Sequence, residues 1–423
     1  MKLMLGVIAD DVTGATDIAS TLVNQGLRVT QVLGVPGESF DPGEAQVIVV
    51  ALKSRTNAAV EAVTWSLQAL HWLRAQGAEQ IVFKYCSTFD STADGNIGPV
   101  ADALMDELDT RFAFVCPAFP DNQRTVYRGH LFVADALLSE SSMKDHPLTP
   151  MRDASLLRLL RAQSSKPVGL ISHDIVSQGA KAIEQAVNEL IKQGVSYGVV
   201  DVLSNADLLA IGEVAANHSL VTGGSAIAAG LARNFKQVVP PTQDAAARFA
   251  PSGRALVIAG SCAEATRRQI AAAQDSWPHR KIDLDALQHD PSGIDPLVSW
   301  AIEQNQQLPV LIYASSTPQE VAAMQDRYGI ENAGTMVERA LSEIAHKLVE
   351  AGFRRLIVAG GETSAAVLST LDIEALRIGA QIDPGVPWTS TLSERPLMLA
   401  LKSGNFGGDD FFSRAFALLD DGY

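Results

Sequence analysis

The chain has 423 residues, of which 47% are hydrophobic and 19% charged, and its formal net charge is -15. This length exceeds the usual size of a single hydrophobic core, so we expect two domains. The negative charge argues against a nucleic-acid or acidic-membrane partner, because both need a basic surface.

The first 235 residues repeat one pattern: a short apolar run, a polar turn and a helical stretch. The apolar runs are LMLGVIA, VTQVLGV, QVIVVAL, IVFKY, FAFVCPA, PVGLIS and YGVVDV. Continuous apolar runs of this length are typical of strands buried on both faces, as in parallel sheets. Between the runs, apolar residues recur at helical spacing. This alternation predicts a doubly wound α/β sheet.

Polar side chains follow these predicted strands. They are Asp10 and Asp11, then Ser54 and Arg55, then Lys84, Thr88 and Asp90, and finally Arg124. Ligands bind beyond the carboxyl ends of parallel strands, so we expect a polar binding site at this edge.

Some of these residues also fit structural roles. Asp11 would cap the helix that follows it, and Arg55 would pair with any surface carboxylate. The adjacent Asp10 and Asp11 exceed what one helix cap needs, and their mutual repulsion favours contact with a cation or a charged partner. Lys84 lies within a strand pattern, where lysine is rarely buried without a partner.

Residues 236–253 interrupt the alternation. This segment contains Pro240 and Pro241 and ends on Pro-Ser-Gly, which predicts a linker. The alternation then resumes with ALVIAG, PVLIYAS, RLIVAG and LMLALKSG, and a long helical pattern covers residues 335–352. The sequence therefore predicts two α/β domains, residues 1–235 and 254–423, with mainly parallel sheets and a cleft between them.

Three predicted strands of the second half run into turns rich in glycine and in serine or threonine. These turns are VIAGSCAEAT, IVAGGETSAA and ALKSGNFGGDDFF. Glycine allows the backbone to approach a ligand closely, and the amides at a helix N-terminus attract phosphate. Three such turns favour a nucleotide site. The sequence has no P-loop motif, no GxGxxG after a strand and no protein-kinase signature, so the nucleotide would be bound by a less common arrangement.

The three cysteines, Cys86, Cys116 and Cys262, are widely spaced and include no CxxC pair. They indicate neither a disulfide framework nor a zinc cluster. The N-terminal apolar run is short and meets two aspartates instead of a cleavage site, and no segment approaches a membrane-spanning length. We therefore expect a reduced, soluble protein of the cytoplasm.

The sequence resembles the four-carbon acid sugar kinases over nearly its whole length, and among them the 3-oxo-tetronate branch. The resemblance rests on ADDVTGATD, KYCSTFDSTADGNIGPV, RTVYRGHLFV, AGSCAEAT, AGGETS, DPGVPW and LKSGNFGG, in family order. The stretch CSTFDST around Asp90 is similar to the 3-oxo-tetronate branch. Ala263 departs from the family, which often has serine there, and PDNQRT is a variable form of the loop before Arg124.

The resemblance implies a substrate domain at residues 1–235 and an ATP domain at residues 254–423. The implied reaction transfers the γ-phosphoryl group of ATP to the 4-hydroxyl of a 3-oxo-tetronate, such as 3-dehydro-erythronate, in carbohydrate acid catabolism. By position, the residues that would contact ATP are Ser261, Gly360, Gly361, Glu362, Thr363 and Gly404. Mg²⁺ is expected to arrive with ATP, without a fixed site on the protein.

Roles for the first half follow as hypotheses. Arg55 would hold the substrate carboxylate, because a planar guanidinium matches it with two hydrogen bonds. Lys84 would offset charge near the transferred group, and Asp11 would accept the hydroxyl proton, with Asp90 as its rival. Asp10 would orient the site or contact magnesium. The other predicted substrate contacts are Ser54, Thr88 and Arg124.

Other functions stay open at this point. They are a kinase of a non-oxidised tetronate such as threonate or erythronate, a nicotinamide-dependent hydroxy-acid oxidoreductase, and a two-domain binding protein. The missing GxGxxG counts against the oxidoreductase. A homodimer is expected only from base rates among soluble enzymes.

Overall fold

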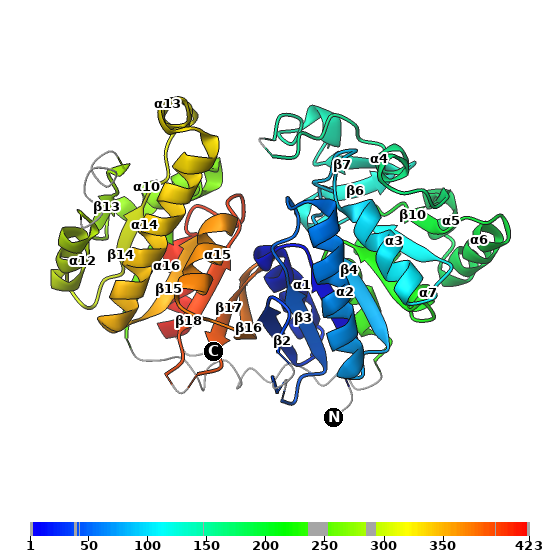
Figure 1. Cartoon of the computed structure of the whole chain (residues 1–423), viewed down its shortest axis with the longest axis horizontal. Helices are drawn as coiled ribbons and strands as arrows, with labels where there is room; N and C mark the ends of the chain where they lie inside the picture. Colours follow the sequence, from blue (N-terminus) through cyan, green and yellow to red (C-terminus); the bar gives the residue numbers. More distant parts are fainter. Residues whose placement is uncertain are drawn as a thin grey trace. The chain divides into compact units, whose positions relative to one another are not determined.

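The computed structural model describes residues 3–37, 40–41, 43–146, 148–235, 253–284, 293–393 and 395–420. The chain divides into two compact units, residues 1–241 and 242–423, and each is of the α/β type with mainly parallel strands (Figure 1). The predicted fold class is confirmed. The predicted linker, residues 236–253, lies outside the described residues except for Gly253.

The strands of the first unit form one continuous parallel array. Their order is β2 (Val29–Leu33), β3 (Val47–Ala51), β1 (Leu5–Ala9), β4 (Gln80–Lys84), β11 (Leu220–Gly223), β5 (Ala113–Cys116), β10 (Tyr197–Val200) and β9 (Val168–Ile171). Every residue of β1, β3 and β4 is buried. Burial on both faces explains the continuous apolar runs in the sequence.

Helices cover both faces of this array. On one face α2 (Ala59–Ala75), α3 (Ile97–Glu107) and α4 (Leu156–Gln163) pack in succession; on the other lie α1 (Val12–Asn24), α8 (Ile227–Ala232), α7 (Asn205–Ala215) and α6 (Ala180–Lys192), with the short α5 (His173–Val176). Right-handed crossovers that run in opposite directions along a sheet place their helices on opposite faces. The connection through α1 leads from β1 to β2, whereas α3 leads from β4 to β5 on the other side.

A small antiparallel sheet, absent from the predicted elements, follows β5. It consists of β6 (Arg124–Tyr127), β7 (His130–Val133) and β8 (Ala136–Leu137), flanked by the short 3-10 helices η1 (Pro120–Asn122) and η2 (Leu138–Glu140). Asp201 fixes the turn between β6 and β7, because its carboxylate accepts the backbone amides of Arg128 and Gly129 at 2.8 Å each.

The second unit has the strand order β13 (His279–Lys281), β14 (Val310–Tyr313), β12 (Arg254–Ala259), β15 (Phe353–Ala359), β18 (Met398–Lys402), β17 (Val386–Thr391) and β16 (Ala375–Asp383). Strand β17 is antiparallel to both of its neighbours, and the rest pair in parallel. The apolar runs in the sequence predict β12, β14, β15 and β18 but not the other three strands.

Helices α14 (Ile330–Glu350) and α15 (Gly361–Thr370) pack over β15, with α12 (Ile294–Glu303) and α13 (Pro318–Tyr328) against α14. Helices α10 (Glu264–Gln274) and α16 (Phe411–Asp420) pack together elsewhere on the sheet (Figure 1). The helix predicted at residues 335–352 is α14, which begins earlier, at Ile330. The core under α16 includes Trp388, Phe411 and Phe416.

None of the described helices is both long enough and apolar enough to cross a membrane.

Candidate active site

A cluster of charged side chains lies where the chain changes direction in the first sheet. Asp10 and Asp11 directly follow β1, and Lys84 is the last residue of the adjacent strand β4, opposite Ala9 in the register. The connection after β1 leaves toward β2, and the connection after β4 leaves toward β5. Such a switch point opens a crevice at the carboxyl ends of the strands, which is where α/β proteins bind ligands.

Arg55 joins the acidic residues of this cluster. Its Nε and Nη2 donate to the two carboxylate oxygens of Asp10 at 2.8 Å each, and Nη2 also donates to Asp11 at 2.6 Å. Its Nη1 lies 3.7 Å from the Oδ2 of Asp90. The repulsion between adjacent aspartates is therefore offset by a shared guanidinium. The contact of Arg55 with a substrate carboxylate stays a prediction.

Asp11 combines the two roles that the sequence left open. It is the N-cap of α1 and accepts the amide of Gly14 at 3.1 Å and the hydroxyl of Thr13 at 2.7 Å. Burial alone would raise the pKa of Asp11, but the charges of Arg55 and Lys84 outweigh it and lower the pKa to about 2. A carboxylate this acidic is a weak base, so it would take up a proton from a hydroxyl only as that oxygen forms its new bond.

Lys84 is buried, with 3% of its surface exposed, among several carboxylates. Its charge helps to lower the pKa of Asp11, whereas burial raises the pKa of Asp17 in spite of the charge of Lys84. A Cβ atom at Gly14 would overlap both the Nζ of Lys84 and the Oδ1 of Asp11. Glycine at this position lets the ammonium and the carboxylate approach the start of α1 together.

The loop after β4 carries Asp90 in a strained backbone. Phe89 and Asp90 are consecutive non-glycine residues with positive φ, 64° and 32°. The Oγ1 of Thr88 donates to Asp90 at 2.5 Å and contacts the Sγ of Cys86 at 3.0 Å. Left-handed conformations outside glycine cost energy and cluster at functional sites. Burial, reinforced by the charge of Asp90, raises the pKa of Cys86 to about 12, so the thiol stays protonated.

The remaining predicted substrate residues differ in position. Ser54 is buried beside the cluster, and its amide donates to the carbonyl of Asp10 at 3.0 Å. Arg124 lies in the small antiparallel sheet and donates to the carbonyl of Asn122. Its role as a substrate contact stays a prediction.

Two residues without an assigned role in the sequence analysis adjoin the cluster. The Oγ of Ser225 donates to the Oδ2 of Asp17 at 2.6 Å, whereas the buried Oδ1 of Asp17 has no hydrogen-bond partner among the described residues. Ser225 follows β11, whose last residue, Gly223, pairs with Lys84. The stretch VTGGSA could have pointed to Ser225 in the sequence, since it resembles the glycine-bearing turns of the second half.

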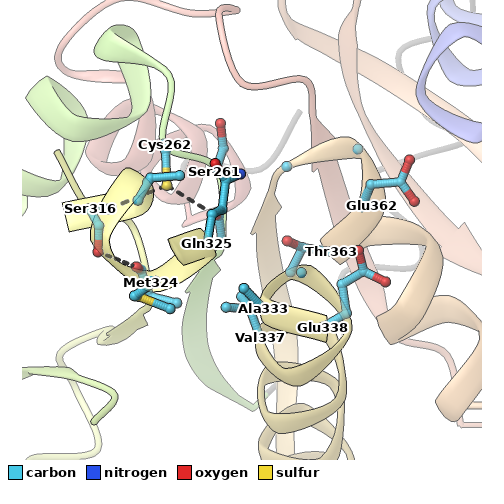
Figure 2. Close-up of a pocket in the computed structure, with 16 residues that line it drawn as sticks. Ser261, Cys262, Ser316, Met324, Gln325, Ala333, Val337, Glu338, Glu362 and Thr363 are labelled. Atoms are coloured by element: carbon cyan, nitrogen blue, oxygen red, sulfur yellow. Dashed lines mark hydrogen bonds between the residues drawn. The ribbon is translucent and has the colours of Figure 1, made fainter. Parts of the chain in front are cut away.

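The second unit contains a pocket of about 290 Å³ at its own switch point. The connection after β12 leads to β13 on one side, and the connection after β15 leads toward β16 on the other. Figure 2 shows Ser261 and Cys262 on one side of the pocket and Glu362 and Thr363 on the other. The glycine turns predicted from the sequence follow β12, β15 and β18, which are neighbouring strands.

The second of these turns opens a helix into the pocket. Gly360 has a φ of 131°, which strongly favours glycine, and α15 begins at Gly361. The amides at a helix N-terminus suit an anion such as phosphate. Gly360, Gly361, Glu362 and Thr363 all line the pocket, and their contact with a nucleotide stays a prediction.

The rest of the pocket is more apolar. Val321 and Met324 come from α13, and Ala333 and Val337 from α14 (Figure 2). Gly404 is not among the lining residues, but a Cβ at this position would overlap the Oγ of Ser261. The turn after β18 therefore packs closely against the turn after β12. A pocket with phosphate-type turns at one side and an apolar wall at the other fits a nucleotide.

Within the described ranges, no group of three or more His, Cys, Asp or Glu side chains is arranged to hold a metal ion.

Comparison with known proteins agrees with this division of the chain. A family model described as a sugar-binding N-terminal domain matches residues 5–231, and one described as a nucleotide-binding C-terminal domain matches residues 256–412. A Cupriavidus necator protein named 3-oxo-tetronate kinase is 53% identical over 98% of this chain and 97% of its own length. The chain belongs to the 3-oxo-tetronate kinase family.

Other members of the 3-oxo-tetronate kinase family are similar over the same extent. The Pseudomonas fluorescens relative of that name is 52% identical over 99% of this chain and 98% of its own length. Among solved structures, a Salmonella typhimurium protein superposes with a TM-score of 0.88 at 44% identity, covering 97% of this chain and 98% of the other. A Haemophilus influenzae protein gives a TM-score of 0.81 at 43% identity, covering 98% and 100%. The resemblance read from the sequence is confirmed.

Proposed function

We propose that this protein is an ATP-dependent kinase that phosphorylates the 4-hydroxyl of a 3-oxo-tetronate. The observation that carries the proposal is the pocket of the second unit, where turns on neighbouring strands, one of them a helix N-terminus, surround a space suited to a polyphosphate. The name shared by full-length relatives supports 3-oxo-tetronate as the acceptor.

In this proposal the second unit binds ATP. Ser261 and the turn from Gly360 to Thr363 would contact the phosphates, and the apolar wall formed by α13 and α14 would contact the base. Mg²⁺ would be held mainly by phosphate oxygens, which suits an ion that keeps several of its own waters. It supplies charge neutralisation at the phosphates when bound.

The first unit would bind the acid sugar at its switch point. Arg55 would meet the substrate carboxylate, together with Ser54 and Thr88. In the structure its guanidinium already binds Asp10 and Asp11, which leaves Nη1, near Asp90, as the nitrogen best placed to contact a substrate.

Phosphoryl transfer asks the protein mainly to position the reactants and to neutralise charge. Lys84 would offset the charge of the transferred group. Asp11, held by Thr13, Gly14 and Arg55, would accept a hydrogen bond from the 4-hydroxyl and receive its proton as the bond to phosphorus forms. Asp90 is the alternative acceptor.

We also propose a cellular compartment and an oligomeric state for the enzyme. We place it in the cytoplasm, where ATP is available, and expect a homodimer, the commonest state of soluble enzymes. Light scattering after gel filtration gives the mass of the assembly and would reveal a monomer or a larger oligomer.

A steady-state assay that couples ADP release to NADH oxidation tests the function. Purified protein should consume ATP with a 3-oxo-tetronate and should turn over threonate and erythronate more slowly. Equal or faster turnover of the non-oxidised acids would assign the protein to tetronates instead. A lack of ADP release with all of these acids would reject a kinase of four-carbon acids.

A further inference from the structure

A lysine with no role in the proposed reaction lies beneath the glycine turns of the second unit. Lys402 ends β18 and is completely buried, with 0% of its surface exposed. Its carbonyl accepts the amide of Gly360 at 2.8 Å, which ties it to the turn that opens α15.

The ammonium group of Lys402 uses all three of its hydrogen atoms. Nζ donates to the Oγ1 of Thr266 at 2.9 Å and to the carbonyls of Ser403 and Gly404 at 2.9 and 3.0 Å. Burial lowers the pKa of Lys402 to about 7, and no charged group among the described residues offsets this effect. A buried cation without a carboxylate partner is costly, so an anion bound nearby would stabilise the charged form of Lys402.

These hydrogen bonds fix the direction of two consecutive peptide groups. The described peptide bonds are all trans, and in a trans peptide the N–H points opposite to the C=O. Because the carbonyls of Ser403 and Gly404 face Lys402, the amides of Gly404 and Asn405 face away from it. Gly404 is half-buried and Asn405 is exposed, so this outer side of the turn is open to a ligand.

The turn is also fixed to the wall of the pocket. The Oγ1 of Thr266 donates to the carbonyl of Gly404 at 2.7 Å, and Gly404 lies against Ser261, which lines the pocket. Lys402 and Thr266 therefore hold the third glycine turn, after β18, against the first one, after β12.

We propose that Lys402 is a positioning residue of the nucleotide site: it holds the third glycine turn so that the amides of Gly404 and Asn405 face outward, toward the phosphate that Gly404 is predicted to contact. This inference rests on the proposed function. Lys402 does not touch the ligand: it acts through the peptide groups that it holds.

The test compares ADP with adenosine, which has the base and ribose but no phosphate. Binding of each to the full-length protein and to Lys402→Met is measured by isothermal titration calorimetry or by competition. Methionine has a similar length and shape without the charge or the donors. Lys347→Met is the matched control, because Lys347 belongs to the same unit but forms an exposed ion pair with Asp295.

We expect Lys402→Met to weaken ADP binding by about 10-fold or more and adenosine binding by less than about 3-fold, with Lys347→Met unchanged. ADP binding within about 2-fold of the wild type would overturn the inference, and so would an equal loss for both ligands. If wild-type protein binds no ADP, the proposed function fails and this inference with it.

A second variant covers the case in which Lys402→Met does not fold. Thr266→Val keeps the side-chain shape and removes the hydroxyl that bridges Lys402 and Gly404. It should weaken ADP binding by about 3-fold or more and leave adenosine binding unchanged. Unchanged ADP affinity in a folded Thr266→Val protein would also overturn the inference.

Discussion

The guanidinium of Arg55 forms a two-pronged ion pair with Asp10, with both donor–acceptor distances at 2.8 Å. These residues are 45 positions apart in the sequence, and the pair joins the end of β1 to the loop after β3. Asp10 is 6% exposed, so its carboxylate depends on this partner for charge compensation. The pair is thus a structural requirement of the site, whatever else Arg55 contacts.

Replacement of Arg55 by alanine should therefore affect stability as well as catalysis. We expect Arg55→Ala to lower the free energy of unfolding by about 3 kcal/mol, because it leaves buried carboxylates unpaired. The value of kcat/KM for the acid should fall by at least about 100-fold. Denaturant unfolding and steady-state kinetics measure the two effects.

The exposed pair of Arg158 and Asp153 provides the control for this variant. Arg158→Ala should change neither stability nor rate appreciably, because exposed ion pairs contribute little. If Arg55→Ala leaves the KM for the acid unchanged while the protein stays folded, Arg55 does not hold the substrate carboxylate.

Asp11 and Asp90 compete for the role of proton acceptor. We expect Asp11→Asn to lower kcat by about 100-fold or more with a smaller effect on the KM for ATP, since asparagine keeps the shape but cannot accept the proton. Asp90→Asn should cost less. Rapid-quench measurement of the chemical step separates it from product release. Near-normal turnover in Asp11→Asn with a large loss in Asp90→Asn would exchange the two assignments.

Gly14 is the third point at which the site can be tested. Gly14→Ala places a methyl group against both Asp11 and Lys84. We expect kcat to fall by about 10-fold or more while the protein remains folded, because small displacements of catalytic groups are costly. Gly37→Ala serves as the control, since a Cβ there meets no atom within 4 Å. Full activity in Gly14→Ala would show that the approach of Lys84 to Asp11 is not required.

The depressed pKa of Lys402 predicts a specific pH dependence of stability. Between its folded-state pKa of about 7 and the ordinary value of 10.5, the unfolded chain binds a proton that the folded protein does not. The free energy of unfolding should therefore rise with pH in this window, by up to about 1.4 kcal/mol per pH unit, relative to the Lys402→Met variant.

Urea denaturation of both proteins at several pH values within this window measures the difference, and the comparison cancels other titrating groups. A difference that stays constant with pH would mean that burial does not depress the pKa of Lys402 in the folded protein.

Much of the fold could be predicted because its strands are buried on both faces. Runs such as VIVVA in β3 are continuous and unambiguous. The glycine turns after β12, β15 and β18 mark where these strands end. Strands β16 and β17 were missed because ALRIGAQID and VPWTST carry charged and polar residues that an antiparallel strand tolerates. The three-stranded sheet was missed for a similar reason: its strands are short and only partly buried.

The candidate site was predictable in its positions but not in its pairings. The placement of Asp10, Asp11 and Lys84 at strand ends was sufficient to locate them. It did not reveal that Arg55 binds Asp10, because that contact depends on how the loops after β1 and β3 lie relative to each other in three dimensions. Asp17 with Ser225, and Lys402 with Thr266, join residues 208 and 136 positions apart, and sequence spacing carries no signal for such contacts.

The most direct test of the account is to identify the product of the reaction. Phosphorus NMR of a reaction with ATP and a 3-oxo-tetronate should show one ADP for each new phosphomonoester, with coupling to the C4 protons that locates the phosphate on the 4-oxygen. Release of inorganic phosphate without a sugar phosphate, or a phosphate on another carbon of the acid, would contradict it.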